Sequence, residues 1–103
     1  MKKVIDGKMY NTETAREIAS FDNGLGYNDF RHCSETLYLT KKGAWFLQGE
    51  GGPMSKYSRS VGDMTGGGEE FEILTPNEAL SWLENHEITD TIEEYFADKI
   101  EEA

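Results

Sequence analysis

Two short apolar runs separated by a polar turn dominate the middle of the chain and predict an antiparallel strand pair. In 35-ETLYLTKKGAWFLQGE-50, residues 37–39 form one arm, residues 44–47 form the other, and Lys41-Lys42-Gly43 forms the turn. Both arms are rich in aromatic residues, which suit a half-buried sheet surface. The segment 70–75 predicts another strand, with Phe71 and Ile73 on one face.

The N-terminal quarter contains a turn signal followed by a helical spacing. Asp6-Gly7 lies between two arms with apolar residues and suits the positive φ angles of a type I′ turn, so a small hairpin is expected. Asn11 or Thr12 can cap a helix, and apolar residues 15, 18 and 19 fall at i, i+3, i+4. We therefore expect a short helix here, ended by the glycines at 24 and 26.

The C-terminal third has the pattern of two amphipathic helices. Residues 75–78, TPNE, match a capping box with proline at the first helical position, and apolar residues follow at 79, 80, 82 and 83. Thr89-Asp90 is a second cap signal before apolar residues 92, 95, 96 and 100. The expected fold is α+β: one domain, 1–103, in which a small antiparallel sheet carries the N-terminal helix and the two C-terminal helices.

Charge is distributed unevenly along the 103 residues. The net charge is −10, and residues 69–103 hold twelve acidic residues against one basic residue, whereas residues 1–68 have a net charge of +1. Such a field repels nucleic acids and anionic membranes and attracts basic protein surfaces. The chain shows no signal peptide or membrane-spanning run, and its single cysteine is typical of a reducing compartment, so the expected location is the bacterial cytoplasm.

The most unusual stretch is 49-GEGGPMSKYSRSVGDMTGGG-68, which has seven glycines. Its spacing fits neither the phosphate loop GxxxxGK[ST] nor the dinucleotide fingerprint GxGxxG. A phosphate site built from backbone amides and polar side chains at 55–59 is one alternative, and a flexible connection between strands is another. We favour a loop that contacts a protein partner through Lys56, Tyr57 and Arg59, because tyrosine and arginine are enriched at binding hot spots.

Other chemistry is weakly indicated. His32-Cys33 could be a nucleophilic pair completed by His86, but adjacent strand residues point to opposite faces. We expect Cys33 to be a small buried residue and His32 to be partly exposed. No zinc spacing or calcium-loop pattern is present, so we expect no catalytic residue, metal or cofactor.

The acidic residues have two interpretations. They could serve only solubility. Alternatively, carboxylates fixed on adjacent helices could imitate nucleic-acid phosphates and occupy a basic groove, with binding that weakens in salt. The candidate contacts are Glu69, Glu70, Glu72, Glu84, Glu87, Glu93, Glu94, Asp98, Glu101 and Glu102.

The stretches VIDGKMYNTETAREIAS, ETLYLTKKGAWFLQGEGGPMSKYS and EILTPNEALSWLE, with the acidic tail, resemble small proteins carried by phages, plasmids and conjugative elements of Gram-positive (Firmicutes) bacteria. The resemblance covers nearly the whole chain and includes no catalytic signature. Some of these proteins are anti-CRISPR proteins, which inhibit the RNA-guided nuclease of type II systems. Several anti-CRISPR families are acidic and block DNA-binding surfaces of the nuclease, so the resemblance implies this role without identifying functional residues.

The leading hypothesis is therefore a non-enzymatic inhibitor from a mobile genetic element, an anti-CRISPR that binds a guide-loaded type II nuclease and acts as a DNA mimic. The first alternative is an accessory or adaptor domain, with homodimer formation as one form, for which Trp82 would be an anchor if it is exposed. The second alternative is a small enzyme that binds an anionic substrate at the glycine-rich stretch.

Overall fold

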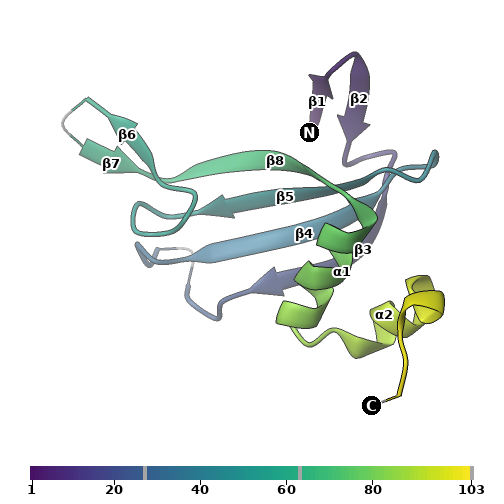
Figure 1. Cartoon of the computed structure of the whole chain (residues 1–103). Helices are drawn as coiled ribbons and strands as arrows, with labels where there is room; N and C mark the ends of the chain where they lie inside the picture. Colours follow the sequence, from purple (N-terminus) through teal and green to yellow (C-terminus); the bar gives the residue numbers. More distant parts are fainter. Residues whose placement is uncertain (27, 63, 103) are drawn as a thin grey trace.

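The chain folds into an antiparallel sheet followed by two C-terminal helices, an α+β architecture (Figure 1). The computed structural model describes residues 1–26, 28–62 and 64–102. The main sheet has the order β3-β4-β5-β8, with β3 at Arg16–Asp22, β4 at Cys33–Leu39, β5 at Trp45–Gly51 and β8 at Gly68–Leu74. The helices are α1 (Pro76–Asn85) and α2 (Thr89–Tyr95), and a 3₁₀ turn, η1 (Ala97–Lys99), follows.

Two hairpins extend from opposite ends of the main sheet (Figure 1). The first pairs β1 (Lys2–Ile5) with β2 (Lys8–Asn11), and the second pairs β6 (Arg59–Val61) with β7 (Met64–Gly66). Asp6 and Gly7 have φ angles of 51° and 76°, as a type I′ turn requires, so the predicted N-terminal hairpin is confirmed.

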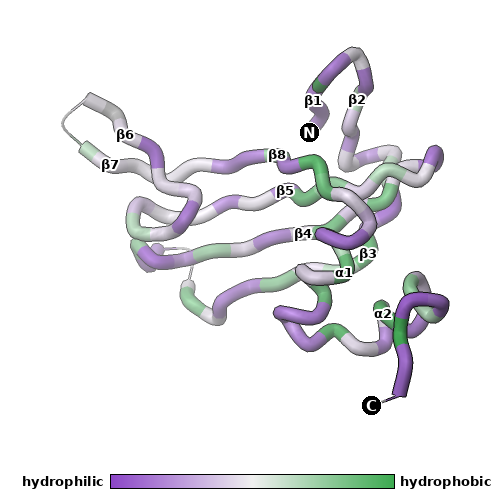
Figure 2. The backbone as a smooth tube through the Cα atoms, in the orientation of Figure 1, coloured by the Kyte–Doolittle hydropathy of each residue, from purple (hydrophilic) through white to green (hydrophobic). Residues whose placement is uncertain are grey.

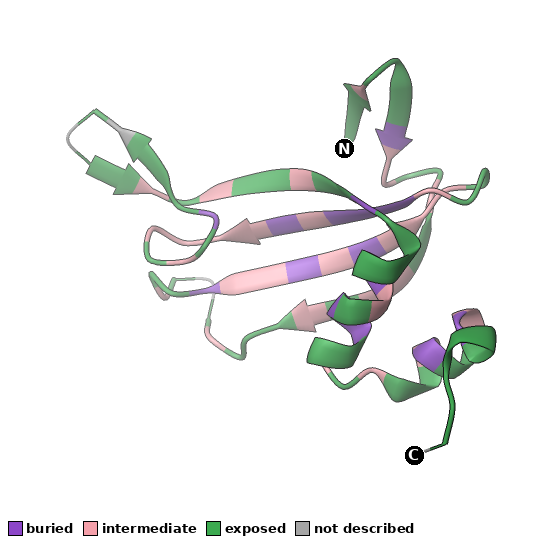
Figure 3. Ribbon diagram, viewed as in Figure 1, coloured by how far each residue is buried: buried purple, intermediate pink, exposed green. Residues whose placement is uncertain are grey.

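The core lies between one face of the sheet and the helices, and Figure 3 shows the buried positions on β4, β5 and the inner side of α1. Leu37 of β4 pairs with Leu47 of β5, which places both on this face. The buried core residues are Leu37, Trp45, Leu47, Leu74, Ala79, Trp82, Leu83, Ile92 and Phe96. The two predicted C-terminal helices therefore pack on the sheet as expected.

The opposite face of the sheet carries a smaller aromatic cluster. Phe46 is fully buried, and its ring lies 5.5 Å from Tyr10, 5.0 Å from Tyr38 and 5.5 Å from Phe71 between centroids. Tyr10 belongs to β2, so the N-terminal hairpin covers this end of the face. Both helices lie on the other side of the sheet (Figure 1).

The predicted N-terminal helix is wrong, because residues 16–22 form the edge strand β3. The capping potential of Asn11 is used, but only for one turn: its side chain accepts a hydrogen bond from the backbone of Glu13, and its carbonyl accepts one from Ala15. The chain then pairs with β4 as an edge strand of the sheet, with a bulge between Glu17 and Ala19. A helical spacing of three small or apolar residues is too weak to oppose six cross-strand pairs.

The two C-terminal helices begin differently. The Thr75 hydroxyl accepts from the Glu78 backbone at 3.1 Å and the Glu78 carboxylate accepts from the Thr75 backbone at 2.8 Å, which confirms the capping box. At α2 the predicted cap is wrong: Ile88 occupies the cap position and makes no side-chain capping bond. The helix also ends at Tyr95, and Ile100 is exposed beyond η1.

Thr75→Ala should lower the free energy of unfolding by about 1 kcal/mol, because it removes the cap acceptor of α1. Thr89→Ala is the matched control, since no capping bond from Thr89 begins α2. Urea unfolding of both variants measures the difference, and equal losses would contradict the assigned role of the capping box.

Candidate functional site

The C-terminal third carries most of the acidic side chains of the protein, and we call these residues together the acidic surface. It comprises twelve residues, all exposed: Glu69, Glu70, Glu72, Glu78, Glu84, Glu87, Asp90, Glu93, Glu94, Asp98, Glu101 and Glu102. Within the described residues, no ion pair joins any of these carboxylates to a basic side chain. Figure 2 shows the hydrophilic colouring around α2 and the C-terminal end.

The structure divides the acidic surface between strand, helices and tail. Glu70 and Glu72 lie on the helix-covered face of β8, whereas Glu69 lies on the opposite face, where it accepts a hydrogen bond from Gln48 at 3.3 Å. Helices α1 and α2 carry five of the other acidic residues. The expectation that the remaining four also lie on the two helices is wrong, because Glu87 is in the turn between α1 and α2, Asp98 is in η1, and residues 101 and 102 follow it.

The glycine-rich stretch contains the end of β5, the loop 52–58, the β6–β7 hairpin and the first residue of β8. Its polar groups serve internal partners: the Ser55 hydroxyl donates to the Gly52 carbonyl at 2.7 Å and accepts from the Tyr57 backbone at 3.1 Å. The Arg59 guanidinium donates to the Glu69 carbonyl at 2.5 Å. The loop is thus organised by its own hydrogen bonds and by contacts with β8.

A buried carboxylate, Glu35 of β4, anchors this loop to α1. Glu35 is 3% exposed, and one of its oxygens accepts from the Tyr57 hydroxyl and lies 2.6 Å from the Lys56 ammonium. The other oxygen accepts from the Trp82 indole at 3.1 Å and lies 3.7 Å from Nε2 of His86. We call these five residues the Glu35 cluster; they bring together β4, the loop and the end of α1.

Sequence reasoning missed the Glu35 cluster, although one signal was present. Glu35 precedes Leu37 and Leu39 at intervals of two, so it shares their sheet face and belongs inside the core. A charged residue at such a position requires buried partners. Of the loop residues expected to contact a partner, Lys56 and Arg59 keep exposed side-chain surface, whereas Tyr57 is 7% exposed and serves the fold.

Gly49 makes the position of Tyr57 possible. It pairs with Glu35 across the β4–β5 ladder, and a Cβ atom at this residue would overlap the Tyr57 ring. The absence of a side chain on β5 therefore lets the tyrosine cross the strand and reach the carboxylate.

Electrostatics favours a structural role for the Glu35 cluster. Burial by itself raises the pKa of Glu35, but hydrogen bonds from Lys56, Tyr57 and Trp82 outweigh it and hold the pKa below its ordinary value. Burial and the neighbouring carboxylate raise the pKa of Tyr57. A general base needs a pKa near the working pH, so a carboxylate stabilised as the anion and occupied by several donors is a poor one.

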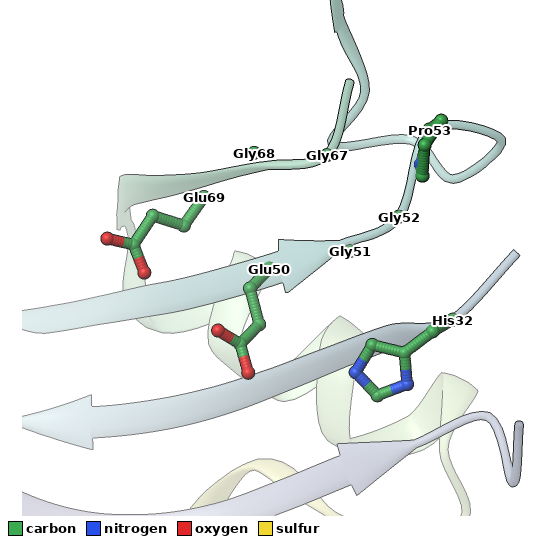
Figure 4. A pocket seen from close by; sticks show the side chains of 8 residues that line it. All are labelled: His32, Glu50, Gly51, Gly52, Pro53, Gly67, Gly68 and Glu69. Atoms are coloured by element: carbon green, nitrogen blue, oxygen red, sulfur yellow. The ribbon is translucent and has the colours of Figure 1, made fainter. Parts of the chain in front are cut away.

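A cavity of about 490 Å³ lies at the glycine-rich end of the sheet (Figure 4). Glu50 and Glu69 face it from the helix-free side of neighbouring strands, and His32 closes one end. Both carboxylates already accept hydrogen bonds, from Ser34 and Gln48 respectively. The cavity is open to solvent, and we assign it no ligand.

The structure reverses the expected burial of His32 and Cys33. His32 is buried, with Nδ1 3.0 Å from the Leu25 carbonyl, whereas Cys33 is only half-buried. Burial and the nearby Glu35 carboxylate raise the pKa of the Cys33 thiol, which disfavours the thiolate that a nucleophile requires. His86 contacts Glu35 and stacks on Phe21, with ring centroids 4.0 Å apart.

Among residues 1–26, 28–62 and 64–102, no group of three or more metal-binding side chains is close enough to hold an ion. No helix in these ranges is long and apolar enough to cross a membrane.

Glu35→Gln should lower the free energy of unfolding at neutral pH by about 3 kcal/mol, because it leaves buried donors without an anionic acceptor. The lowered pKa means that ionised Glu35 stabilises the fold above its unfolded pKa of about 4.3. This contribution is lost as the pH falls through the folded pKa. The difference between wild type and variant should therefore shrink in acid.

Urea unfolding from pH 7 down to pH 3 tests this expectation. Glu50→Gln is the control, because it removes a less buried carboxylate on the other face of the sheet. Parallel pH profiles for wild type and Glu35→Gln would show that Glu35 does not hold its lowered pKa in the folded state.

Gly49→Ala should displace Tyr57 and cost about 2 kcal/mol, as overpacking of a close contact does. Gly26→Ala is a suitable control, since nothing lies within 4 Å of a Cβ atom there. A Gly49→Ala protein with an unchanged urea midpoint would rule out the contact between Tyr57 and β5.

Comparison of the chain with protein-family models gave no match, and neither did comparison with curated proteins or with solved structures.

Proposed function

We propose that the protein is a non-enzymatic inhibitor that binds a basic, nucleic-acid-binding surface of another protein through the acidic surface. The observation that carries this proposal is that all twelve carboxylates are exposed and form no ion pair within the described residues. Concentrated like charge destabilises a folded protein by self-repulsion. A basic partner would relieve that repulsion, so the cost is understandable if the surface is used for binding.

The positions of the carboxylates suit rapid, electrostatically steered binding. Glu70 and Glu72 are fixed by the β5–β8 ladder, and Glu84 is fixed on a capped helix that packs on the core. Fixed backbone positions limit the conformational freedom lost on binding to that of the side chains, and complementary fields raise the association rate. The exposed part of the glycine-rich loop, at Lys56 and Arg59, is the proposed second contact region.

The partner that we propose is a guide-loaded type II RNA-guided nuclease, on the basis of the sequence resemblance to small proteins of mobile elements. Such a nuclease holds nucleic acid in a positively charged channel. The alternative is an adaptor domain with a different partner. Trp82 is 8% exposed and donates to Glu35, so it is not available as the anchor that this alternative would use.

A DNA-cleavage assay tests the proposal, with the protein titrated into a guide-loaded type II nuclease from a Gram-positive host at two salt concentrations. Inhibition should weaken at high salt. The double variant Glu93→Lys/Glu94→Lys should inhibit about tenfold less than wild type, because it reverses charge on α2.

Glu13→Lys/Glu17→Lys is the matched control: it changes net charge equally at exposed residues outside the acidic surface and should inhibit as wild type does. Equal inhibition by both double variants would reject the acidic contact. Absence of inhibition across several nucleases would reject the nuclease as partner and favour the adaptor alternative.

A further inference from the structure

A groove between α1 and β8 opens within the acidic surface. Its volume is about 340 Å³, at the lower end of the range for ligand pockets, which is enough room for an amino-acid side chain. Leu47, Leu74 and Trp82 line it with buried apolar surface. The Trp82 indole is held in place by its hydrogen bond to Glu35, so this lining is fixed before any partner binds.

The charges around the groove are negative. Glu72 is exposed and forms no ion pair within the described residues, and Glu78 uses one carboxylate oxygen in the capping box, which leaves its charge uncompensated. Lys56 also lines the groove, but its ammonium lies 2.6 Å from the buried Glu35 carboxylate, which offsets its charge. The groove therefore has buried apolar residues in its lining and two carboxylates at its rim.

The chain itself places a cation at this rim. Lys99, the single basic residue of the C-terminal third, donates from Nζ to Oδ1 of Asn77 at 3.1 Å, and Asn77 lines the groove. An amide oxygen of the groove is thus already used as an acceptor for a side-chain ammonium group. This contact is independent of the acidic residues and shows that an amide oxygen at the rim can accept a hydrogen bond from a cationic side chain.

Resting on the proposed function, we propose that the groove between α1 and β8 receives an arginine side chain of the basic partner. The methylene groups of arginine would lie against Leu47 and Leu74, and its guanidinium would reach the carboxylates of Glu72 and Glu78. Arginine fits better than lysine because its guanidinium is planar, more weakly hydrated and able to stack on aromatic rings. Arginine is also enriched among the residues that dominate binding energy.

The chain offers its own reporter for this proposal, because it has two tryptophans in different places. Trp82 lines the groove, whereas Trp45 packs against Phe96, with ring centroids 5.2 Å apart. In an NMR titration of the full chain with L-arginine amide, the indole N–H signal of Trp82 should shift to saturation, and that of Trp45 should stay in place. Sodium chloride at equal ionic strength is the control, and an equal shift of Trp82 in salt would overturn the proposal.

Two matched pairs of variants distinguish binding in the groove from an effect of the net charge of the protein. Ser81 is exposed and lines the groove, so Ser81→Tyr should fill it and abolish the Trp82 shift without a change in charge, while Ser81→Ala should keep it. Glu72→Lys should weaken arginine-amide binding by about tenfold relative to Glu93→Lys, which changes net charge equally outside the groove. Retention of the shift in Ser81→Tyr, or equal effects of the two lysine variants, would overturn the proposal.

The same variants distinguish this inference from the proposed function. If Glu93→Lys/Glu94→Lys loses inhibition but Ser81→Tyr inhibits as wild type does, the groove proposal fails and the acidic contact stands. If Ser81→Tyr loses inhibition by about tenfold or more while Ser81→Ala retains it, the groove is part of the contact. If arginine amide shifts Trp82 but no variant changes inhibition, the groove binds arginine and the proposed function fails.

Discussion

The buried carboxylate of Glu35 is the interaction on which the arrangement of the molecule depends. A charge inside a core is costly unless donors surround it, and here the donors come from a loop residue pair, Lys56 and Tyr57, and from Trp82 of α1. Each donor lies in a different part of the chain from β4, so satisfying the carboxylate fixes the loop and the helix relative to the sheet. The glycine at position 49 is a consequence of this arrangement, since the tyrosine must cross β5 to reach its acceptor.

The same cluster connects the interior to the acidic surface. Trp82 is held by Glu35 on one side and lines the groove on the other, so the anchor of the core also shapes the part of the surface where Glu72 and Glu78 lie. The Lys56 ammonium would otherwise offset these surface charges, but it is turned towards Glu35. Internal charge pairing thus leaves the outer carboxylates uncompensated and available to a basic partner.

Different elements cover the two faces of the sheet, and this asymmetry affects where the acidic side chains lie. Both helices cover one face, and on the other Tyr10 of the N-terminal hairpin packs against Phe46. Strand β8 is an edge of the main sheet, and its three glutamates discourage further strands from pairing there. A protein partner at this edge is therefore expected to bind side chains rather than to extend the sheet.

The sequence by itself determined the local elements whose signals are short-range. The turn at Asp6-Gly7, the 35–50 hairpin and the capping box at Thr75 each depend on residues that touch their near neighbours, and all three are present. The exposure of the acidic residues in the C-terminal third could also be predicted from the sequence, because carboxylates usually lie on the surface.

Tertiary structure decided what depends on contacts between distant residues. Residues 16–22 form a strand because they pair with β4, and α2 ends at Tyr95 although apolar residues follow it. The Glu35 cluster and the groove needed β4, the loop, β8 and α1 to meet, and no local pattern specifies which donor will reach a buried carboxylate. The free energy of burial depends on the assembled core, so the positions of these residues follow from the tertiary structure and not from the sequence pattern.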